Sequence, residues 1–363
     1  MADYRIASLP GDGIGKEVMP EGRRAADAAL ARVGRSIEWV DYDWSCETYR
    51  ATGRMMPEDG ASRMKDHDAI FLGAVGWPGV PDHVSLWGLL IPLRRELDLY
   101  ANVRPVRLMP GIESPLANRT PEEIDFVVVR ENVEGEYSEI GGRLYHGTEH
   151  EQAVQEAVFT RRGVDRIMDY AFDLAARRKA AGEGGRTSGK VTSATKSNGI
   201  VHTMPFWDER FEAAKARHPD IATDQFHIDI LTAHFVRHPD WFDVVVGSNL
   251  FGDILSDLGP AVAGSIGIAP SANLDPTGTN PSMFEPVHGS APDIAGKGIA
   301  NPIAAVWTAA MMLDHLGEGE AAKLIEDGME AALVDPAART PDLGGRASTR
   351  DACDAVVRAI EAA

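Results

Sequence analysis

Two aspartates lie four residues apart in the segment GSNLFGDILSDLG, residues 247–259. The apolar run VVV before it is typical of a strand buried on both faces, and we expect a helix to begin at its Ser-Asn dipeptide. Asp253 and Asp257 would then project from one helix face. Like charges at this spacing cost about 0.2–0.5 kcal/mol on an isolated helix. A bound Mg²⁺ or Mn²⁺ would turn that repulsion into attraction. The pair is therefore a candidate metal site, and two solvated carboxylates are the alternative.

Arginines gather in two other segments. RRELDLYANVRP contains Arg94, Arg95 and Arg104, and VVVREN places Arg130 at the end of an expected strand. Each arginine alone is compatible with a surface ion pair, but guanidinium groups also hold carboxylates in a fixed orientation. The chain has a formal net charge of −19, so a site for an anion has to concentrate positive charge locally. The arginines therefore predict a pocket for a multiply charged anion.

Two candidate proton-transfer groups accompany these charges. Tyr137 follows Arg130 closely in ENVEGEY, and Lys196 ends the expected strand VTSATKSN. A lysine at a strand end usually extends to solvent. Next to a metal and arginines, it can instead lose its proton and act as a base.

The glycine-rich stretch LPGDGIGKE near the N-terminus suggests a dinucleotide-binding loop, but its spacing does not fit one. That fingerprint requires G-x-G-x-x-G, and here the spacing is G-x-G-x-G, followed by Lys16 and Glu17 where small residues are needed. We expect a glycine turn that ends a strand and starts a helix. A better dinucleotide site is FEPVHGSAPDIAGKGIANP, residues 284–302, expected to be an irregular loop of small residues. Asp293 in this loop can accept hydrogen bonds from ribose hydroxyls and would repel a 2′-phosphate, which favours NAD over NADP.

The chain as a whole has 363 residues, enough for one large or two ordinary domains. Short β-rich runs alternate with helical stretches, which predicts an α/β fold. Residues 141–160 interrupt this alternation and are expected to form an extended, largely polar hairpin. The acidic charge disfavours nucleic-acid and membrane partners.

Targeting and redox signals are weak. Two cysteines without a CxxC motif suit a reducing compartment, and no basic segment followed by an apolar one begins the chain. The longest apolar stretch, residues 299–313, is too short to span a membrane and predicts a buried helix with Asn301 as its N-cap. We therefore expect a cytoplasmic protein.

Seven segments in order resemble motifs of the β-decarboxylating dehydrogenase family, which includes isopropylmalate, isocitrate and tartrate/D-malate dehydrogenases. These segments are GDGIG, LRRELDLYANVRP, VVRENVEGEY, VTSATKSN, HIDILTAH, SNLFGDILSDL and FEPVHGSAPDIAGKGIANP. The resemblance implies an enzyme with the isopropylmalate dehydrogenase-like two-domain α/β fold, which is not a Rossmann fold and has a mixed sheet flanked by helices. It implies a large NAD-binding domain, residues 1–106 plus 262–363. Residues 107–261 would form a small domain with the dimer interface and an arm at about 141–160.

The same resemblance implies a role for individual residues. Asp229, Asp253 and Asp257 would bind Mn²⁺ or Mg²⁺, Lys196 would be the base, Tyr137 would help to protonate C3, and Arg94, Arg104 and Arg130 would bind the substrate carboxylates. NAD would contact Ile14, Glu285, His288, Gly289, Ser290, Ala291, Asp293 and Asn301. In this family the second subunit supplies the lysine and the first aspartate, so a homodimer with shared active sites is expected. The resemblance also allows a potassium requirement, for which the sequence carries no signature.

Substrate choice in this family depends on the segment before Arg94, here DHVSLWGLLIPLRRE. Isocitrate enzymes resemble S-x-N at this point, and Trp87 cannot satisfy a buried carboxylate as an asparagine does. Leu90 and Ile91 would suit a small apolar pocket, but Trp87 would crowd an isopropyl group. We therefore expect the tartrate/D-malate branch, with a small anionic 2-hydroxy diacid as substrate. A 3-isopropylmalate dehydrogenase, a metal-independent reductase and a non-catalytic homologue that binds NAD or a metabolite are the competing interpretations.

Overall fold

The computed structural model describes residues 2–184 and 187–363, which form two compact units. The first unit consists of Met1–Leu99, Arg107–Pro121 and Pro260–Ala363, and the second of Tyr100–Val106 and Glu122–Gly259. Relative to the expected boundaries, residues 107–121 and 260–261 lie in the first unit and residues 100–106 in the second.

The sheet of the first unit has the strand order β2-β1-β3-β12-β11. Its strands are β1 (Tyr4–Gly11), β2 (Ile37–Asp41), β3 (Ala69–Ala74), β11 (Pro270–Leu274) and β12 (Ser282–Pro286). The first four in spatial order are parallel, and β11 is antiparallel to β12. Every residue of β3 is buried, as expected for a central strand covered on both faces.

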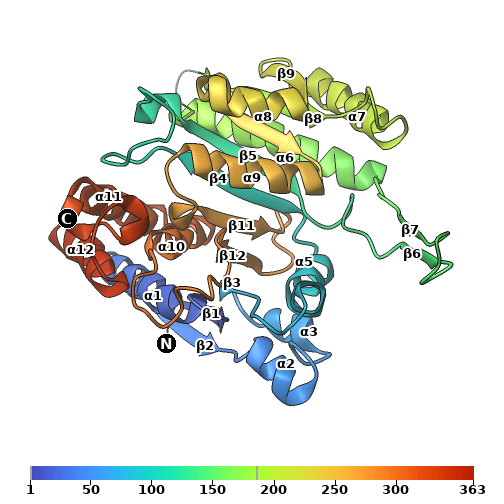
Figure 1. The fold of residues 1–363 in the computed structure, drawn as a ribbon. Coiled ribbons are helices and arrows are strands. Elements are labelled where there is room, and N and C mark those ends of the chain that lie inside the picture. Colours follow the sequence, from blue (N-terminus) through green and yellow to red (C-terminus); the bar gives the residue numbers. More distant parts are fainter. Residues whose placement is uncertain (1, 185–186) are drawn as a thin grey trace. The chain divides into compact units, whose positions relative to one another are not determined.

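Helices cover both faces of this sheet (Figure 1). On one face, α1 (Gly15–Arg32), α10 (Ile303–His315), α11 (Gly319–Val334) and α12 (Thr349–Ala362) pack against one another. On the other face lie α2 (Cys46–Thr52), α3 (Gly60–Met64), α4 (Asp82–Ser85), a π-helical turn (Leu86–Leu90) and α5 (Ile91–Glu96). Leucines and methionines of this second layer form one apolar core with β1 and β3.

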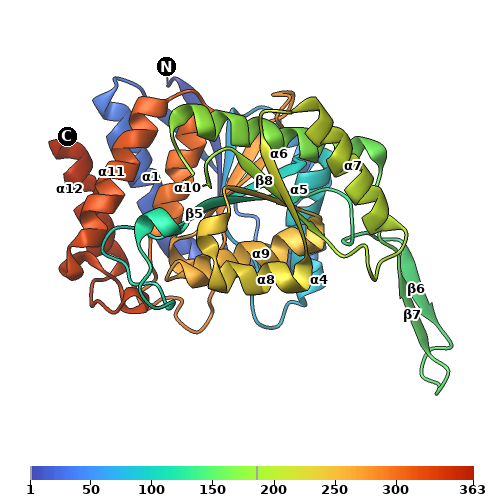
Figure 2. The ribbon, with the colours of Figure 1, turned by 90° about the horizontal axis from the view of Figure 1, so that it is seen from above.

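The sheet of the second unit has the order β4-β5-β10-β8-β9. Its strands are β4 (Ala101–Arg107), β5 (Asp125–Glu131), β8 (Lys190–Thr195), β9 (Ala222–His227) and β10 (Val244–Gly247). The last four in spatial order are parallel, so their carboxyl ends share one edge. Figure 2 shows α6 (Arg161–Ala181) and α7 (Thr203–Arg217) on one face, with α8 (Ile228–Arg237) and α9 (Asn249–Val262) on the other. The predicted α/β fold with a mixed sheet flanked by helices is confirmed.

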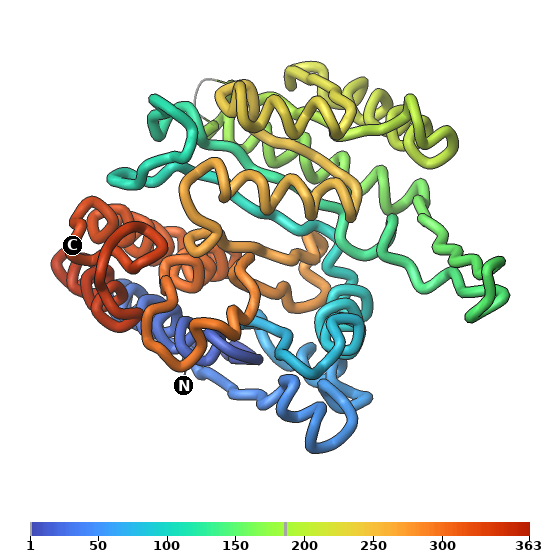
Figure 3. Tube along the Cα trace, in the orientation of Figure 1, coloured from blue at the N-terminus to red at the C-terminus, as the bar shows by residue number. Residues whose placement is uncertain are grey.

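The expected hairpin is present as β6 (Gly141–Leu144) and β7 (Gln152–Gln155), an antiparallel pair. All eight strand residues are exposed. In Figures 1 to 3 the hairpin extends away from the sheet and helices of the second unit. It therefore gains little burial from its own chain.

Close packing fixes the glycine turn of GDGIG. Gly11 and Gly13 have φ values of 67° and 53°, which side chains with a Cβ rarely adopt. A Cβ on Gly11 would lie 1.9 Å from the Ala74 carbonyl oxygen, and one on Gly13 would lie 2.0 Å from that of Ser290. The Asp12 carboxylate accepts hydrogen bonds from the backbone N–H groups of Cys46 and Gly76, both at 2.9 Å. The turn ends β1 and starts α1, as predicted.

Two local expectations are corrected. The helix after residue 299 begins at Ile303 with Pro302 as its N-cap, whereas Asn301 lies one residue earlier and accepts a hydrogen bond from the Ile303 N–H. The segment expected to be irregular from residue 284 begins in β12, so Glu285 is a buried strand residue. In the part of the chain that the structure describes, no helix combines the length and apolar character needed to cross a membrane.

Replacing Gly13 with alanine should destabilise the protein more than replacing Gly34, because both have positive φ but only Gly13 abuts backbone atoms. Gly34→Ala, with φ of 73° and open space around its Cβ, should cost about 1–2 kcal/mol. Gly13→Ala should lower the free energy of unfolding by more than Gly34→Ala does, because the Ser290 backbone has to move. The free energy of unfolding in denaturant measures both, and equal losses would contradict the packing explanation.

Candidate active site

Arg130 lies at the carboxyl edge of the second unit's sheet, where β5 pairs with β10 in parallel and places Gly247 beside it. Its guanidinium donates from Nε and Nη2 to the Asn249 side-chain oxygen, at 3.1 and 2.7 Å. Nη1 forms an ion pair with Asp253. The arginine side chain is 3% exposed, so it is held in one orientation by the first turns of α9.

Arg104 of β4 approaches the same helix. Its Nη1 donates to the Ser256 hydroxyl at 2.7 Å and lies 3.7 Å from a carboxylate oxygen of both Asp253 and Asp257. The two aspartates project from one face of α9, as predicted. They already share one cation, the Arg104 guanidinium, which reduces their mutual repulsion.

Tyr137 completes this cluster. Its hydroxyl donates a hydrogen bond to Asp253 Oδ2 at 2.7 Å, and the Arg130 guanidinium lies 5.4 Å from the centre of its ring. Burial, reinforced by the Asp253 carboxylate, raises the pKa of Tyr137 to about 12. The phenol therefore keeps its proton at neutral pH.

Lys196 and Asp229 form a second cluster at the same sheet edge. Parallel pairing of β8 and β9 sets Thr195 opposite His227, so the residues that follow these two strands meet. Lys196 Nζ donates to Asp229 Oδ1 at 2.6 Å, and the lysine ammonium lowers the pKa of that carboxyl. Asp229 is 68% exposed, so the pair faces solvent.

The three predicted metal ligands do not meet within one chain. Across residues 2–184 and 187–363, no three His, Cys, Asp or Glu side chains are grouped as a metal site requires. Asp253 and Asp257 do converge on one positive charge, and carboxylate oxygens are what Mg²⁺ and Mn²⁺ prefer. These two residues therefore fit a divalent ion that has at least one further ligand from elsewhere.

Arg94, at the end of α5, pairs with a residue predicted to contact the cofactor. Its Nη2 donates to Glu285 Oε1 at 2.7 Å, and the same oxygen accepts from the Asn273 side chain at 2.8 Å. Both charged side chains are 11% exposed. Arg94 Nε is buried without a hydrogen-bond partner among the described residues, so the guanidinium retains a donor for a ligand.

The expected dinucleotide loop packs directly on the glycine turn. The Ile14 N–H donates to the Ser290 carbonyl at 2.9 Å, and the Ile14 side chain packs with Ala291. The Glu17 carboxylate accepts from the N–H groups of Gly296 and Gly298, at 2.5 and 3.0 Å. Asp293 is exposed, and Gly289 has open space around its Cβ position.

His288 gives this loop a buried acceptor. Burial lowers the pKa of its imidazole, so the ring is neutral at pH 7. Nδ1 lies 3.0 Å from the Gly289 carbonyl and must be the donor there, which leaves Nε2 as an acceptor. Within the described part of the chain Nε2 is buried and has no partner. An N–H or O–H group of a nucleotide would satisfy it, so the loop fits a dinucleotide.

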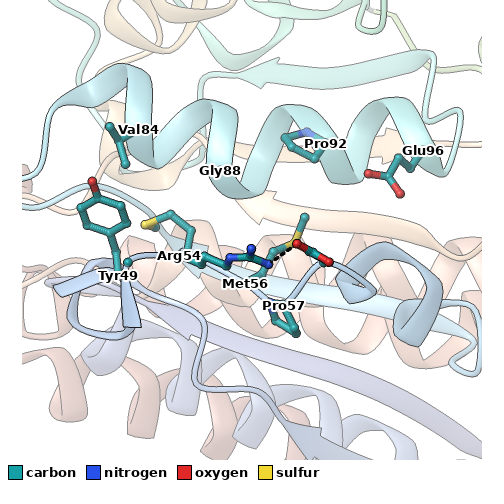
Figure 4. Close-up of a pocket in the computed structure, with 11 residues that line it drawn as sticks. Tyr49, Arg54, Met56, Pro57, Val84, Gly88, Pro92 and Glu96 are labelled. Carbon is teal, nitrogen blue, oxygen red and sulfur yellow. Dashed lines mark ion pairs between the residues drawn. The ribbon is translucent and has the colours of Figure 1, made fainter. Parts of the chain in front are cut away.

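The segment of Trp87 and Leu90 includes the π-helical turn. Leu90 is buried in the apolar core of the first unit, whereas Trp87 is half-buried beneath the Arg95 guanidinium. Figure 4 shows Val84, Gly88, Pro92 and Glu96 on the side of this segment that lines a pocket of about 390 Å³.

Sequence reasoning missed several residues that position the site. Asn249 and Ser256 share the helix face of the two aspartates, so the helical spacing could have identified both. Glu136 accepts from the Ser248 hydroxyl and the Leu250 N–H at the start of α9, where a carboxylate is favoured by the helix dipole. No local sequence pattern marked Asn273 as part of the site, because only strand pairing between β11 and β12 brings it near Glu285.

Comparison with known proteins identifies the family. The isocitrate/isopropylmalate dehydrogenase family model matches residues 5–357. The chain belongs to this family. It is 57% identical to the D-malate dehydrogenase [decarboxylating] of Escherichia coli (strain K12), with 99% of each chain covered. It is 56% identical to the tartrate dehydrogenase/decarboxylase of Pseudomonas putida, with 96% of this chain and 95% of the relative covered.

Solved structures of family members share the fold. An isocitrate dehydrogenase from Methylococcus capsulatus is 32% identical, covers 99% of both chains and has a TM-score of 0.87. A β-decarboxylating dehydrogenase from Thermococcus kodakarensis is 36% identical over 99% of this chain and 96% of that one, with a TM-score of 0.76. The predicted family and its fold are confirmed, and this family member is an enzyme.

Glu131, next to Arg130, is a fully buried acid whose carboxylate accepts from the N–H groups of Val133 and Glu134. Burial raises its pKa to about 7 from 4.5, although these N–H groups oppose the shift. Glu131 therefore binds its proton more tightly in the folded state than in the unfolded state. The free energy of unfolding consequently falls as pH rises from 4.5 to about 7.

Glu131→Gln should remove this pH dependence, because glutamine does not titrate. The free energy of unfolding of the parent, relative to that of the variant, should fall as pH rises from 5 to 8. Denaturant unfolding at several pH values measures the difference. A difference that stays constant with pH would show that Glu131 remains ionised throughout.

Proposed function

We infer that this enzyme oxidises and decarboxylates a small 2-hydroxy diacid with NAD and a divalent metal. D-malate, giving pyruvate and CO₂, is the preferred substrate. Tartrate, giving oxaloglycolate or D-glycerate and CO₂, is the second. The 57% identity to a D-malate dehydrogenase [decarboxylating] over 99% of both chains carries the proposal.

Three arginines would bind the two carboxylates of the diacid. Arg104 and Arg130 are almost fully buried and pair with Asp253. Arg94 holds Glu285 through Nη2 and retains a free Nε among the described residues. A substrate carboxylate would take over donors that currently serve these acids, and charge-assisted bonds to arginine would fix its orientation. This local positive charge offsets the repulsion from a chain of net charge −19.

Asp253 and Asp257, joined by Asp229, would hold the metal, and the loop around His288 would hold NAD. When bound, the metal would supply a Lewis acid and NAD a hydride acceptor. Lys196 would accept the proton of the substrate C2 hydroxyl. A lysine accepts a proton only as the neutral amine, so the Lys196 ammonium must first release a proton to solvent. Its ion pair with the exposed Asp229, which favours the ammonium form, costs little to break at the surface. Tyr137, which keeps its proton at neutral pH, would donate to C3 after CO₂ departs.

Lys196 and Asp229 would serve the active site of a second copy of the chain. Within one chain they form a cluster separate from Asp253 and Asp257. A two-fold dimer that exchanges these residues would complete both sites. The β6–β7 hairpin is proposed to clasp the second copy, because Ile140, Leu144 and Val154 are 58%, 56% and 49% exposed.

A substrate panel with NAD and Mn²⁺ tests the proposed activity. We expect kcat/KM to be highest for D-malate, lower for tartrate and lowest for 3-isopropylmalate, because Trp87 leaves little room for a C3 substituent. NADH absorbance and released CO₂ are measured together. A clear preference for 3-isopropylmalate would make the chain a 3-isopropylmalate dehydrogenase instead.

Two further classes of protein would behave differently in the same panel. A metal-independent reductase would still reduce NAD after thorough chelation and would release no CO₂ from D-malate. A non-catalytic homologue would bind NAD or a hydroxy acid in calorimetry without turnover of any member of the panel.

Mixing two inactive variants tests the shared site. Lys196→Met and Asp257→Asn should each be inactive as pure dimers, because every site lacks one group. After dissociation and reassembly of an equal mixture, half of the dimers are mixed, and each mixed dimer has one intact site. About one quarter of the parent activity should return.

The matched control mixes Lys196→Met with Asp229→Asn. One chain contributes both of these residues to a given site, so every site of the mixed dimer keeps one defect and no activity should return. Recovery in this control, or none in the first mixture although mixed dimers form, would refute the exchange.

A further inference from the structure

The π-helical turn decides which arginine stacks on Trp87. The Ile91 N–H donates to the Leu86 carbonyl, five residues back, so this turn contains one more residue than an α-helical turn. An α turn takes about 3.6 residues, so one π turn followed by one α turn takes about eight. Residue i+8 then lies over residue i, where an unbroken α-helix would place residue i+7.

The positions of the two arginine side chains agree with this spacing of eight residues. Arg95, eight residues after Trp87, has its guanidinium carbon 4.8 Å from the centre of the indole ring. Arg94, seven residues after Trp87, instead points to Glu285 and donates to it at 2.7 Å. Because of the extra residue, the two adjacent arginines have different partners. Arg94 pairs with the buried Glu285, and Arg95 stacks on Trp87.

The side of the turn that faces Met55 is fixed as well. A Cβ on Gly88 would lie 2.7 Å from Met55 Cγ, so the backbone of the turn rests directly on the methionine. Met55 is 2% exposed and belongs to the apolar core. Gly88 is also one of the residues that line the pocket in Figure 4. The backbone next to Trp87 is thus fixed against Met55, and the Arg95 guanidinium covers the indole ring.

We propose that Arg95 is a positioning residue that holds the Trp87 ring in one orientation and thereby sets the size of the C3 substituent that the enzyme accepts. This proposal rests on the proposed function, in which Trp87 limits the substrate pocket. An indole that is free to rotate would leave room for a branched substituent. A guanidinium stacked on its face makes rotation costly, because the cation–π contact is lost.

A double-mutant cycle tests this role, with the ratio of kcat/KM for D-malate to that for 3-isopropylmalate as the readout. Arg95→Met should lower the ratio by about two- to fivefold, the factor that corresponds to one partly exposed cation–π contact. The change should arise mainly from a lower KM for 3-isopropylmalate. Arg95→Lys, which keeps the charge but not the planar group, should restore part of the ratio.

In a Trp87→Ala background, Arg95→Met should have no further effect, because the ring that it positions is absent. If 3-isopropylmalate is not turned over, its inhibition constant against D-malate replaces its kcat/KM. Arg23→Met is the matched control, because Arg23 stacks on Trp39 at a similar distance, 4.9 Å, on elements outside the site. An unchanged ratio in Arg95→Met, or the same change with and without Trp87, would overturn the proposal.

A spectroscopic readout separates failure of this inference from failure of the proposed function. The emission of the parent minus that of Trp87→Phe isolates the Trp87 signal, and the same subtraction is made in the Arg95→Met background. The isolated signal should shift when the guanidinium is removed. If it does not, the positioning role is wrong even in a fully active D-malate enzyme. If it shifts but the panel shows no hydroxy-diacid oxidation, the proposed function is wrong and the selectivity assignment falls with it.

Discussion

The site depends on the mutual neutralisation of two aspartates and two arginines. Asp253 and Asp257 lie on one face of α9, where their charges repel, and Arg104 lies 3.7 Å from both. Arg104 and Arg130 are 8% and 3% exposed, and guanidinium groups this deeply buried need anions beside them. The two arginines can therefore be buried because aspartates lie beside them, and the two aspartates can share one helix face because an arginine reduces their repulsion. Because the arginines come from β4 and β5 and the acids from α9, these ion pairs also hold the helix against the sheet.

The same balance would allow a strongly acidic chain to bind the acidic substrate proposed for it. The donors that now serve Asp253 and Glu285 are those that a substrate carboxylate would use. Asp253 and Asp257 would hold the proposed divalent ion, and the guanidinium groups of Arg104 and Arg130 would then pair with the substrate instead. In the proposed function the site would exchange one set of ion pairs for another without exposing an unpaired buried charge, which would be costly.

Parallel strand pairing supplies the geometry. β5, β10, β8 and β9 run in one direction, so the residues after them meet at one edge. Neighbouring strands bring neighbouring groups together: Arg130 meets the start of α9, and Lys196 meets Asp229. The first cluster comes from β4, β5 and the helix that follows β10, whereas Lys196 and Asp229 follow β8 and β9, so one chain holds two clusters. This separation is the physical basis for proposing a site completed by a second chain.

The sequence by itself determined the elements whose signals are local. Helical spacing placed Asp253 and Asp257 on one face, buried apolar runs marked strands such as β5 and β10, and the G-x-G-x-G spacing excluded a dinucleotide fingerprint. The family followed from seven ordered motifs. Only the tertiary structure decided that Asn273 and Arg94 converge on Glu285, that Arg95 covers Trp87, and that Pro302 rather than Asn301 is the N-cap of α10. These outcomes depend on strand register, on one extra residue in a π turn and on contacts between distant segments, none of which a local pattern encodes.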